Sequence, residues 1–175
     1  MDFVMHRDAV LSECGTFRYR LSRWGWADGE LLSPEDWAGS VTFVMLNPSA
    51  ADAAVDDPTV RRCIAFARRW RKRRLEVVNL FAFRATDPNV LAQAEFPIGP
   101  LNDGHLLDAC AGGALVVAAW GDMGTLRDRD QEVMSRFSSL GISPMCLGVT
   151  KTKQPFHPLY RRADSELVPY WGRCA

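Results

Sequence analysis

The stretch VTFVMLNPS, residues 41–49, decides the fold. Its first six residues are almost all apolar and rich in β-branched side chains, which is typical of a central strand covered on both faces. The run stops at Asn47, because the proline that follows cannot donate to a strand ladder. Similar runs are LEVVNLFAF at 75–83 and ALVVAAW at 114–120, with a shorter fourth within 142–148. The chain is therefore predicted to contain a sheet of buried, mostly parallel strands.

Segments with helical patterns separate these strands. Asp57 and Asp87 each precede a proline, and an aspartate before proline is a common start of a helix. Further helices are predicted at 102–111, 125–139 and 163–171. A partly alternating stretch within 15–32 adds a half-buried strand. We predict one α/β domain over residues 1–175, a three-layer α/β/α arrangement with a central, mostly parallel four-stranded sheet and an N-terminal strand or hairpin.

The composition is that of an ordinary globular chain without net charge. Lys and Arg number 21, as do Asp and Glu, so a nucleic-acid surface would need locally concentrated basic residues. The five cysteines stand singly, which favours free thiols in a reducing compartment over a zinc site. No apolar run approaches the ~20 residues of a membrane span, and no Walker-type or Gly-x-Gly-x-x-Gly loop occurs. We expect a cytoplasmic protein that has no membrane-spanning segment and binds no metal ion or cofactor.

Polar side chains follow each of the four predicted strands. Because the carboxyl ends of parallel strands meet at one edge of a sheet, where ligands bind, these side chains are the candidates for a site. They are Asn47, Ser49, Asp52, Asp56 and Asp57 after the first strand, Asn79 and Arg84 in or after the second, Trp120, Gly121 and Asp122 after the third, and Thr150, Lys151, Gln154 and His157 after the fourth.

Structural roles also explain several of these residues. Asn-Pro-Ser at 47–49 is common turn chemistry, and Asp56 and Asp57 suit a helix N-terminus. His157, between an aromatic residue and a proline, suits an ordinary loop. Asn79 differs, because a buried amide within an apolar strand needs partners from a neighbouring loop or from a ligand.

Four segments, taken in order, resemble the uracil-DNA-glycosylase superfamily. MLNPS (45–49) resembles the first motif of that superfamily, and HPLY (157–160) resembles the second. Between them, VVNLFAFR (77–84) resembles the strand whose asparagine contacts the flipped base. VVAAWG (116–121) resembles an apolar strand that ends in Trp-Gly. More closely, about residues 17–161 are similar to the DUF1643 family, through LNPSxAD, DDPTxRRC, VVNLFAxRATDP, AWG and LGxTKxxxPxHPLY. The chain departs from the family at RRWRKRR (68–74), and HPLY lacks the serine of the glycosylase loop.

The resemblance implies a monofunctional DNA glycosylase, a hydrolase that flips a pyrimidine nucleotide out of the duplex and cleaves its N-glycosidic bond. DUF1643 resembles a bacteriophage-defence glycosylase that removes glucosylated hydroxymethylcytosine. We therefore expect excision of such a modified pyrimidine from phage DNA, which leaves an abasic site. Double-stranded DNA is the expected partner, and no obligate protein partner is expected.

The same resemblance suggests roles for individual residues. Asn47 would orient a water toward C1′, with negative charge from Asp52 or Asp57 near the sugar cation. His157 would hold the charge that develops on the departing base. The expected base-binding residues are Asn79, which reads the base edge, Phe81, which stacks on it, and Pro48, Ser49, Trp120 and Arg84. The expected DNA-binding residues are Lys151, Lys153, Leu159, Tyr160, Arg68 and Arg71. The last two belong to a basic stretch that a solvated helix end explains equally well.

Other functions use the same edge of the sheet. The site could hydrolyse a free nucleoside or nucleotide, or the protein could bind modified DNA without cleaving it. Phosphate hydrolysis with a metal held by the acids of the 52–57 loop has less support, because the only further acid at a strand end is Asp122. The glycosylase hypothesis depends on one spatial prediction, that Asn47, Asn79 and His157 face a common cavity.

Overall fold

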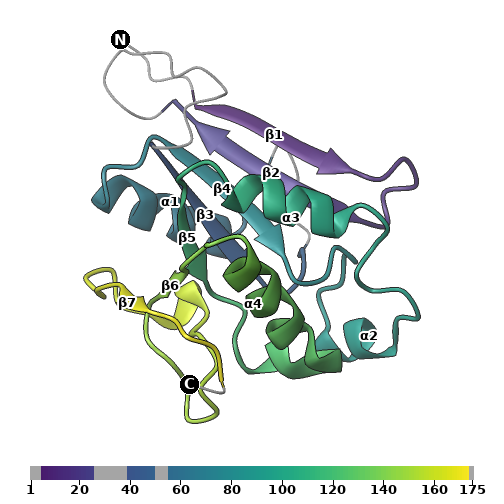
Figure 1. Cartoon of the computed structure of the whole chain (residues 1–175). Coiled ribbons are helices and arrows are strands. Elements are labelled where there is room, and N and C mark those ends of the chain that lie inside the picture. Colours follow the sequence, from purple (N-terminus) through teal and green to yellow (C-terminus); the bar gives the residue numbers. More distant parts are fainter. Residues whose placement is uncertain (1–4, 26–38, 50–54, 174–175) are drawn as a thin grey trace.

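The computed structural model describes residues 5–25, 39–49 and 55–173 (Figure 1). These residues form the strands β1 (His6–Leu11), β2 (Arg18–Trp24), β3 (Ser40–Met45), β4 (Arg74–Asn79), β5 (Leu115–Ala118), β6 (Met145–Cys146) and β7 (Val168–Pro169). The helices are α1 (Pro58–Arg69), α2 (Pro88–Gln93), α3 (Asn102–Cys110) and α4 (Arg129–Ser139), with the short 3-10 helices η1 (Asp122–Asp128) and η2 (Pro158–Tyr160). The predicted mixed α/β class is confirmed.

The strands of the described residues join one mixed sheet in the order β1-β2-β4-β3-β5-β6-β7. The neighbours β4, β3, β5 and β6 pair in parallel. The pairs β1–β2, β2–β4 and β6–β7 are antiparallel. The prediction of a four-stranded, mostly parallel sheet is therefore corrected to a seven-stranded sheet with three antiparallel pairs. The difference arises because the N-terminal hairpin β1–β2 extends the sheet at β4, and the short β7 extends it at β6.

Helices cover both faces of the sheet. On one face, α1 packs through residues such as Val60 against Phe43 of β3. On the other, α3 and α4 pack through residues such as Leu106 and Phe137 against Val78 of β4. Figure 1 shows α3 and α4 in front of the sheet and α1 on its other side. Because β3 and β4 are buried on both faces, their sequences read as nearly continuous apolar runs.

The two Asp-Pro helix starts lie where the sequence predicts them. Asp57 caps α1, accepting a hydrogen bond from the backbone N–H of Val60 at 2.7 Å. Asp87 caps α2 in the same way, accepting from the N–H of Asn89 at 2.8 Å. In the part of the chain that the structure describes, no helix has the length and apolar character needed to cross a membrane.

Two other helix predictions need correction. The stretch 125–139 is divided between η1 and α4, because Arg127 and Asp128 have φ of 55° and 54°, a left-handed conformation that interrupts a helix. The stretch 163–171 is not helical and contains β7. Its backbone carbonyl groups accept instead from the guanidinium of Arg69 in α1.

A fully buried carboxylate joins the N-terminal hairpin to the sheet. Glu76 of β4 accepts hydrogen bonds from Arg20 Nε at 2.7 Å and from Ser22 Oγ at 2.6 Å, both on β2. Its other oxygen accepts from Arg74 Nε at 2.5 Å. The apolar pattern of β4 gives no sign of this network, which is needed because a buried carboxylate is stable only when it is paired and hydrogen-bonded.

Candidate functional site

The strand order of the sheet reverses at β3. The chain passes from β3 through α1 to β4 on one side, and it later reaches β5 on the other side of β3. The carboxyl ends of the strands at such a reversal are the usual ligand site of an open α/β sheet. Met45 and Asn79 are the last paired residues of the neighbouring parallel strands β3 and β4. Asn47 comes two residues after Met45, so it lies just beyond the end of the strand that adjoins Asn79.

Asn79 is a buried amide without a partner. It is 1 % exposed, and neither its Oδ1 nor its Nδ2 forms a hydrogen bond with a described residue. Every second residue of a strand faces the same side, and Leu75 and Val77 face the core on the α1 side. The Asn79 side chain therefore points to the α1 face as well. Each unpaired buried polar group costs about 1–3 kcal/mol. Such an amide is suited to a ligand that offers both a donor and an acceptor.

Asn47 is held by the backbone of the segment after β4. Its Nδ2 donates to the carbonyl of Ala85 at 2.7 Å and contacts the carbonyls of Phe83 at 3.4 Å and of the buried Pro48 at 3.2 Å. The Oδ1 accepts no hydrogen bond from the described residues, and the side chain is partly exposed. The amide oxygen is therefore oriented and available as an acceptor for water.

Asp57 connects the start of α1 with two loops. While its Oδ1 caps the helix, its Oδ2 accepts a hydrogen bond from Ser49 Oγ in the segment after β3. Its negative charge also acts to raise the pKa of His157. The loop that carries His157 approaches α1 because η2 packs against that helix. Ser49, Asp57 and His157, remote in sequence, thus come together beside the N-terminus of α1.

His157 is a partly buried, neutral imidazole with a defined tautomer. Burial is the larger influence and lowers its pKa, while the charge of Asp57 opposes this. The backbone N–H of Leu159 donates to Nδ1 at 3.3 Å. Because Nδ1 is an acceptor, the neutral ring carries its proton on Nε2, which is then a hydrogen-bond donor.

The lowered pKa of His157 predicts a loss of stability in mild acid. The unfolded chain binds a proton on this side chain near the ordinary value of about 6.5, whereas the folded protein binds it only at lower pH. In that window the unfolded state holds more protons, so the free energy of unfolding falls as pH falls below about 6.5. Urea unfolding across this range should show a weaker pH dependence for His157→Gln. The partly buried His105, whose pKa is also lowered by burial, remains in both proteins as the reference. An unchanged slope in the variant would contradict the assignment.

Two predicted base-binding aromatic residues lie in the core on the opposite face. Phe81 is fully buried and Trp120 is 2 % exposed, both in the cluster with α3 and α4. The Trp120 indole donates to Gln154 Oε1 at 2.7 Å. Neither ring presents a surface on which a base can stack. The Arg84 guanidinium donates to the carbonyl of Gly15, in the turn between β1 and β2, at 3.2 Å.

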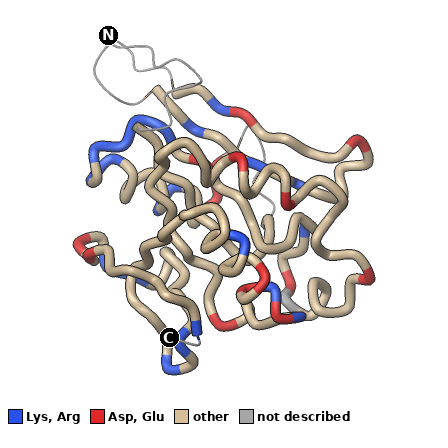
Figure 2. The backbone as a smooth tube through the Cα atoms, in the orientation of Figure 1, with Lys and Arg blue, Asp and Glu red and all other residues tan. Residues whose placement is uncertain are grey.

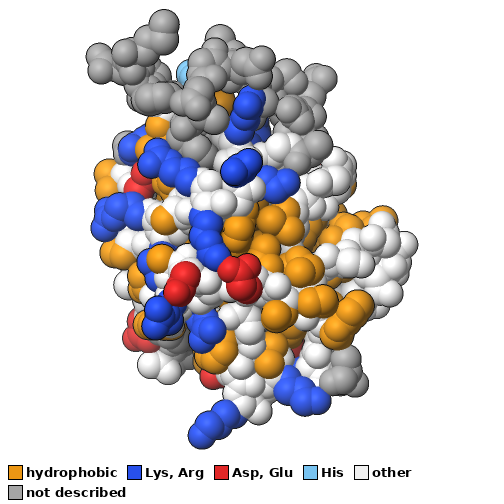
Figure 3. Space-filling view, turned by 90° about the vertical axis from the view of Figure 1, so that its left-hand side faces the viewer, with side chains coloured by type: hydrophobic (Ala, Val, Ile, Leu, Met, Phe, Trp, Pro, Cys, Tyr) orange, Lys and Arg blue, Asp and Glu red, His pale blue; other side chains and the backbone are white. Residues whose placement is uncertain are grey.

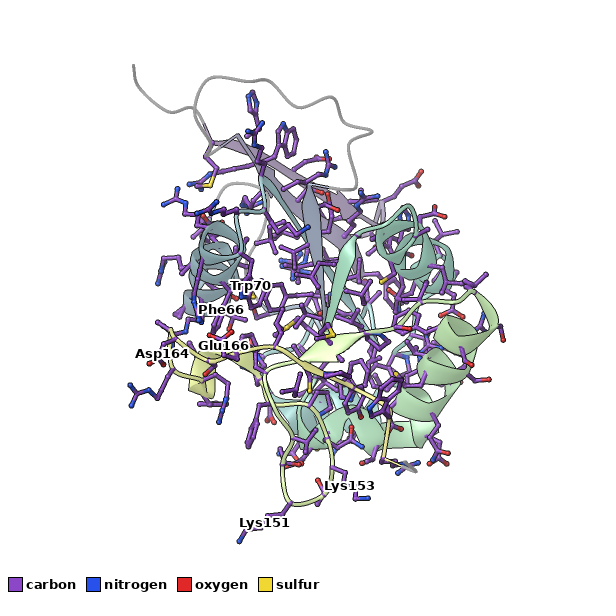
Figure 4. All side chains as sticks on the ribbon, turned by 60° about the vertical axis from the view of Figure 1, so that its left-hand side comes forward. Phe66, Trp70, Lys151, Lys153, Asp164 and Glu166 are labelled. Carbon is purple, nitrogen blue, oxygen red and sulfur yellow. The ribbon has the colours of Figure 1, made fainter. Side chains whose placement is uncertain are left out.

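The predicted DNA-binding residues after β6 divide into two groups. Leu159 and Tyr160 of η2 are 40 % and 80 % exposed, and the Tyr160 ring centroid is 5.6 Å from that of His157. Lys151 and Lys153 are exposed as well. Figure 4 shows these lysines at the tip of the loop before η2, pointing away from Phe66 and Trp70, which mark the C-terminal half of α1. Leu159 and Tyr160 adjoin the imidazole, whereas the two lysines lie at the tip of the loop.

Arg68 and Arg71 lie at the far end of α1 from Asp57. Arg68 lies eleven positions after Asp57, which is about 17 Å along a helix axis. Both arginines are exposed, and Figure 2 shows the concentration of basic residues where α1 ends and β4 begins. The structure does not bring them together with His157. Arg69 and Arg74 of the same stretch contact Glu166 and Glu76, so part of the cluster holds the fold together.

Two residues that sequence reasoning missed hold the carboxyl end of β4. Asn102 is buried and donates from Nδ2 to the carbonyls of Asn79 at 2.9 Å and Leu80 at 3.1 Å. Arg129 is 1 % exposed and donates from Nε to the same Leu80 carbonyl at 3.0 Å. In the sequence both look like ordinary polar residues on the surface of a helix. The one signal that could have revealed them is that each occupies a helical position that faces the core.

The acidic loop before α1 is used for structure. Asp56 pairs with Arg23 Nε at 2.8 Å and with Arg7 at 3.4 Å, and Asp57 is the helix cap. Asp52, a predicted catalytic residue, lies outside the described residues. Within the described ranges, no group of three His, Cys, Asp or Glu side chains is arranged to hold a metal ion.

Comparison with known families connects most of the chain with one family model. The model of DUF1643, described as a protein of unknown function, matches residues 18–159. This range contains Asn47, Asp57, Asn79 and His157. No curated protein and no solved structure matches the chain.

Proposed function

The chain belongs to the DUF1643 family, and we propose that it is a DNA glycosylase of the uracil-DNA-glycosylase fold type. Its substrate is a modified pyrimidine in duplex DNA, with the glucosylated hydroxymethylcytosine of phage DNA as the first candidate. The products are the free base and an abasic site, and the activity serves anti-phage defence in the cytoplasm. The resemblance of MLNPS, VVNLFAFR, VVAAWG and HPLY to the superfamily supports both the fold type and the reaction.

One observation carries the proposal. The Asn79 amide is buried, unpaired among the described residues and directed to the α1 face. Asn79 ends β4 at the edge of the sheet where α1 begins with Asp57, and the charge of Asp57 acts on His157. An extruded base would satisfy both atoms of the amide, because the edge of a pyrimidine offers a donor and an acceptor.

The chemistry follows from the charges around this site. Breaking the bond between C1′ and the base nitrogen leaves the electron pair on the base and a positive charge on the sugar. The carboxylate of Asp57 stabilises that cation, and the Asn47 Oδ1 orients the water that adds to C1′. The adduct then loses a proton to solvent, and the base anion takes up a proton from solvent to become the free base. The Nε2–H of His157 donates to the oxygen of the departing base, where negative charge develops. Leu159 and Tyr160, exposed beside His157, fill the space that the extruded nucleotide leaves in the duplex.

The test is a base-excision assay in EDTA. Duplexes with unmodified cytosine, uracil, hydroxymethylcytosine or glucosylated hydroxymethylcytosine are incubated with the protein and treated with alkali, which cuts the strand at abasic sites. We expect product with the glucosylated base, and a loss of about a hundredfold in Asn47→Ala and in His157→Ala. Normal turnover in both variants contradicts the proposed mechanism. Tight binding without product on any duplex supports a recognition module instead, and hydrolysis of free nucleotides alone supports a small-molecule N-glycosidase.

A further inference from the structure

Two arginines from distant parts of the chain meet beside the HPLY loop (157–160). Arg62 of α1 donates from its guanidinium to the backbone carbonyl of Arg161, the C-cap residue of η2. Each guanidinium lies over an aromatic ring: Arg62 Cζ is 5.3 Å from the centroid of Phe66, and Arg161 Cζ is 4.5 Å from that of Phe156. Stacking restricts the two cations while leaving their N–H groups at the ring edges available.

Neither of these arginines has a carboxylate partner among the described residues. The Nε of Arg62 and the Nε of Arg161 are both buried without a hydrogen bond. Three buried arginines of this protein, Arg23, Arg74 and Arg129, contact carboxylates instead. A partly desolvated guanidinium is costly unless an anion accompanies it. The pair therefore has the chemistry of an anion site that a ligand completes.

We propose that Arg62 and Arg161 bind a phosphate group next to the site at His157. A guanidinium presents parallel N–H donors that match two phosphate oxygens, which favours phosphate over a simple halide. His157 and Arg161 are the N-cap and C-cap residues of the three-residue η2, so the phosphate lies one short turn from the imidazole. That phosphate adjoins the nucleotide whose base reaches Asn79, and in this respect the inference rests on the proposed function.

The location of the pair agrees with the charge of this side of the molecule. Figure 3 looks onto the side where α1 lies, and basic side chains flank a hydrophobic area there. In the sequence, Arg62 belongs to DDPTxRRC and Arg161 directly follows HPLY, two motifs of the DUF1643 resemblance. The phosphate site thus gives a role to the second arginine of RRC, which the proposed chemistry leaves unused.

The direct test observes the arginine Nε–Hε signals of the ¹⁵N-labelled full chain by NMR. Inorganic phosphate, deoxycytidine 5′-monophosphate and a single-stranded oligonucleotide are titrated at constant ionic strength, with chloride as the reference. We expect saturable shifts for Arg62 and Arg161 but not for Arg162, whose exposed guanidinium pairs with Asp164. Tighter binding of the oligonucleotide identifies the DNA backbone as the source of the phosphate, and equal affinity identifies a free nucleotide. No shift with any probe, or an equal shift at Arg162, overturns the proposal.

Variants measure how much the site contributes to DNA binding. Arg62→Gln and Arg161→Gln should each weaken oligonucleotide binding about tenfold and lower the slope of log K against log salt by about 1. Arg61→Gln and Arg162→Gln remove the same charge one residue away, from exposed side chains, and should leave the slope nearly unchanged. Equal losses in all four variants indicate general electrostatics and overturn the site.

Two further comparisons keep the test decisive. Arg62 also holds the backbone of Arg161, so Arg62→Lys, which keeps the charge, is measured beside Arg62→Gln. It should retain the salt slope while binding more weakly, because lysine cannot form the paired contact. Excision is assayed separately: absent excision with an intact phosphate response contradicts the glycosylase alone. Intact excision without that response contradicts the phosphate site alone.

Discussion

Replacing Asp57 by asparagine should reduce base excision about a hundredfold or more while the protein stays folded. Asparagine caps a helix as well as aspartate does, so the hydrogen bond to the Val60 N–H is retained and the start of α1 is preserved. The substitution removes the negative charge that acts on His157. It also replaces the oxygen that accepts from Ser49 by an NH₂ group, to which the rotatable Ser49 hydroxyl can accept instead of donating. In the proposed mechanism that charge stabilises the sugar cation, and preorganised electrostatic groups of this kind contribute about 10²–10³ in rate.

The chain contains a matched control for this substitution. Asp87 caps α2 from an identical Asp-Pro start and is exposed to solvent, so Asp87→Asn makes the same chemical change elsewhere on the molecule. Single-turnover excision and thermal unfolding are measured for both variants. Asp87→Asn should match the wild-type protein in both measurements. Equal excision by Asp57→Asn and wild type would exclude Asp57 from the chemistry and leave it as a helix cap.

Replacing Glu76 by glutamine should destabilise the protein by about 3–5 kcal/mol. The side chain is fully buried, and its carboxylate accepts from Arg20, Ser22 and Arg74. Glutamine has the same size but no charge, and its NH₂ group faces a guanidinium donor that needs an acceptor. Breaking a buried ion pair by removing one partner is costly because the remaining charge is left uncompensated.

Glu166→Gln is the surface control for this prediction. Glu166 also pairs with an arginine, Arg69, but its side chain is 81 % exposed. Water can solvate both groups after the change, so the loss should stay within about 1 kcal/mol. Urea denaturation gives the free energy of unfolding for wild type and both variants. Similar values for Glu76→Gln and Glu166→Gln would show that the buried network is not a main source of stability.

The expected site residues differ in how far sequence alone could assign them. Asn79 was recognisable because a single amide inside an apolar strand is costly without partners, and it is indeed buried and unpaired among the described residues. Phe81 was chosen for its place in the same motif, yet it packs in the core on the α3–α4 face. The chain turns after β4, and strand alternation no longer predicts the direction of a side chain there.

The basic residues illustrate the same limit. The densest run of positive charge, at 68–74, ends α1 far from His157, and its members Arg69 and Arg74 pair with glutamates. Arg62 and Arg161, by contrast, are separated by 99 positions, yet the Arg62 guanidinium contacts the backbone carbonyl of Arg161. Sequence reveals how dense charges are along the chain, whereas pairing depends on which segments become neighbours in space.

Local patterns by themselves determined the mixed α/β class, the buried strands β3, β4 and β5, and the Asp-Pro starts of α1 and α2, because burial period and helix capping involve residues close in the chain. Only the tertiary structure decided that the described strands form one seven-stranded sheet and that 163–171 is not helical. It also decided that Ser49 contacts Asp57 and that the loop with His157 packs against α1. Those features depend on contacts between segments far apart in sequence, and no local period encodes such contacts.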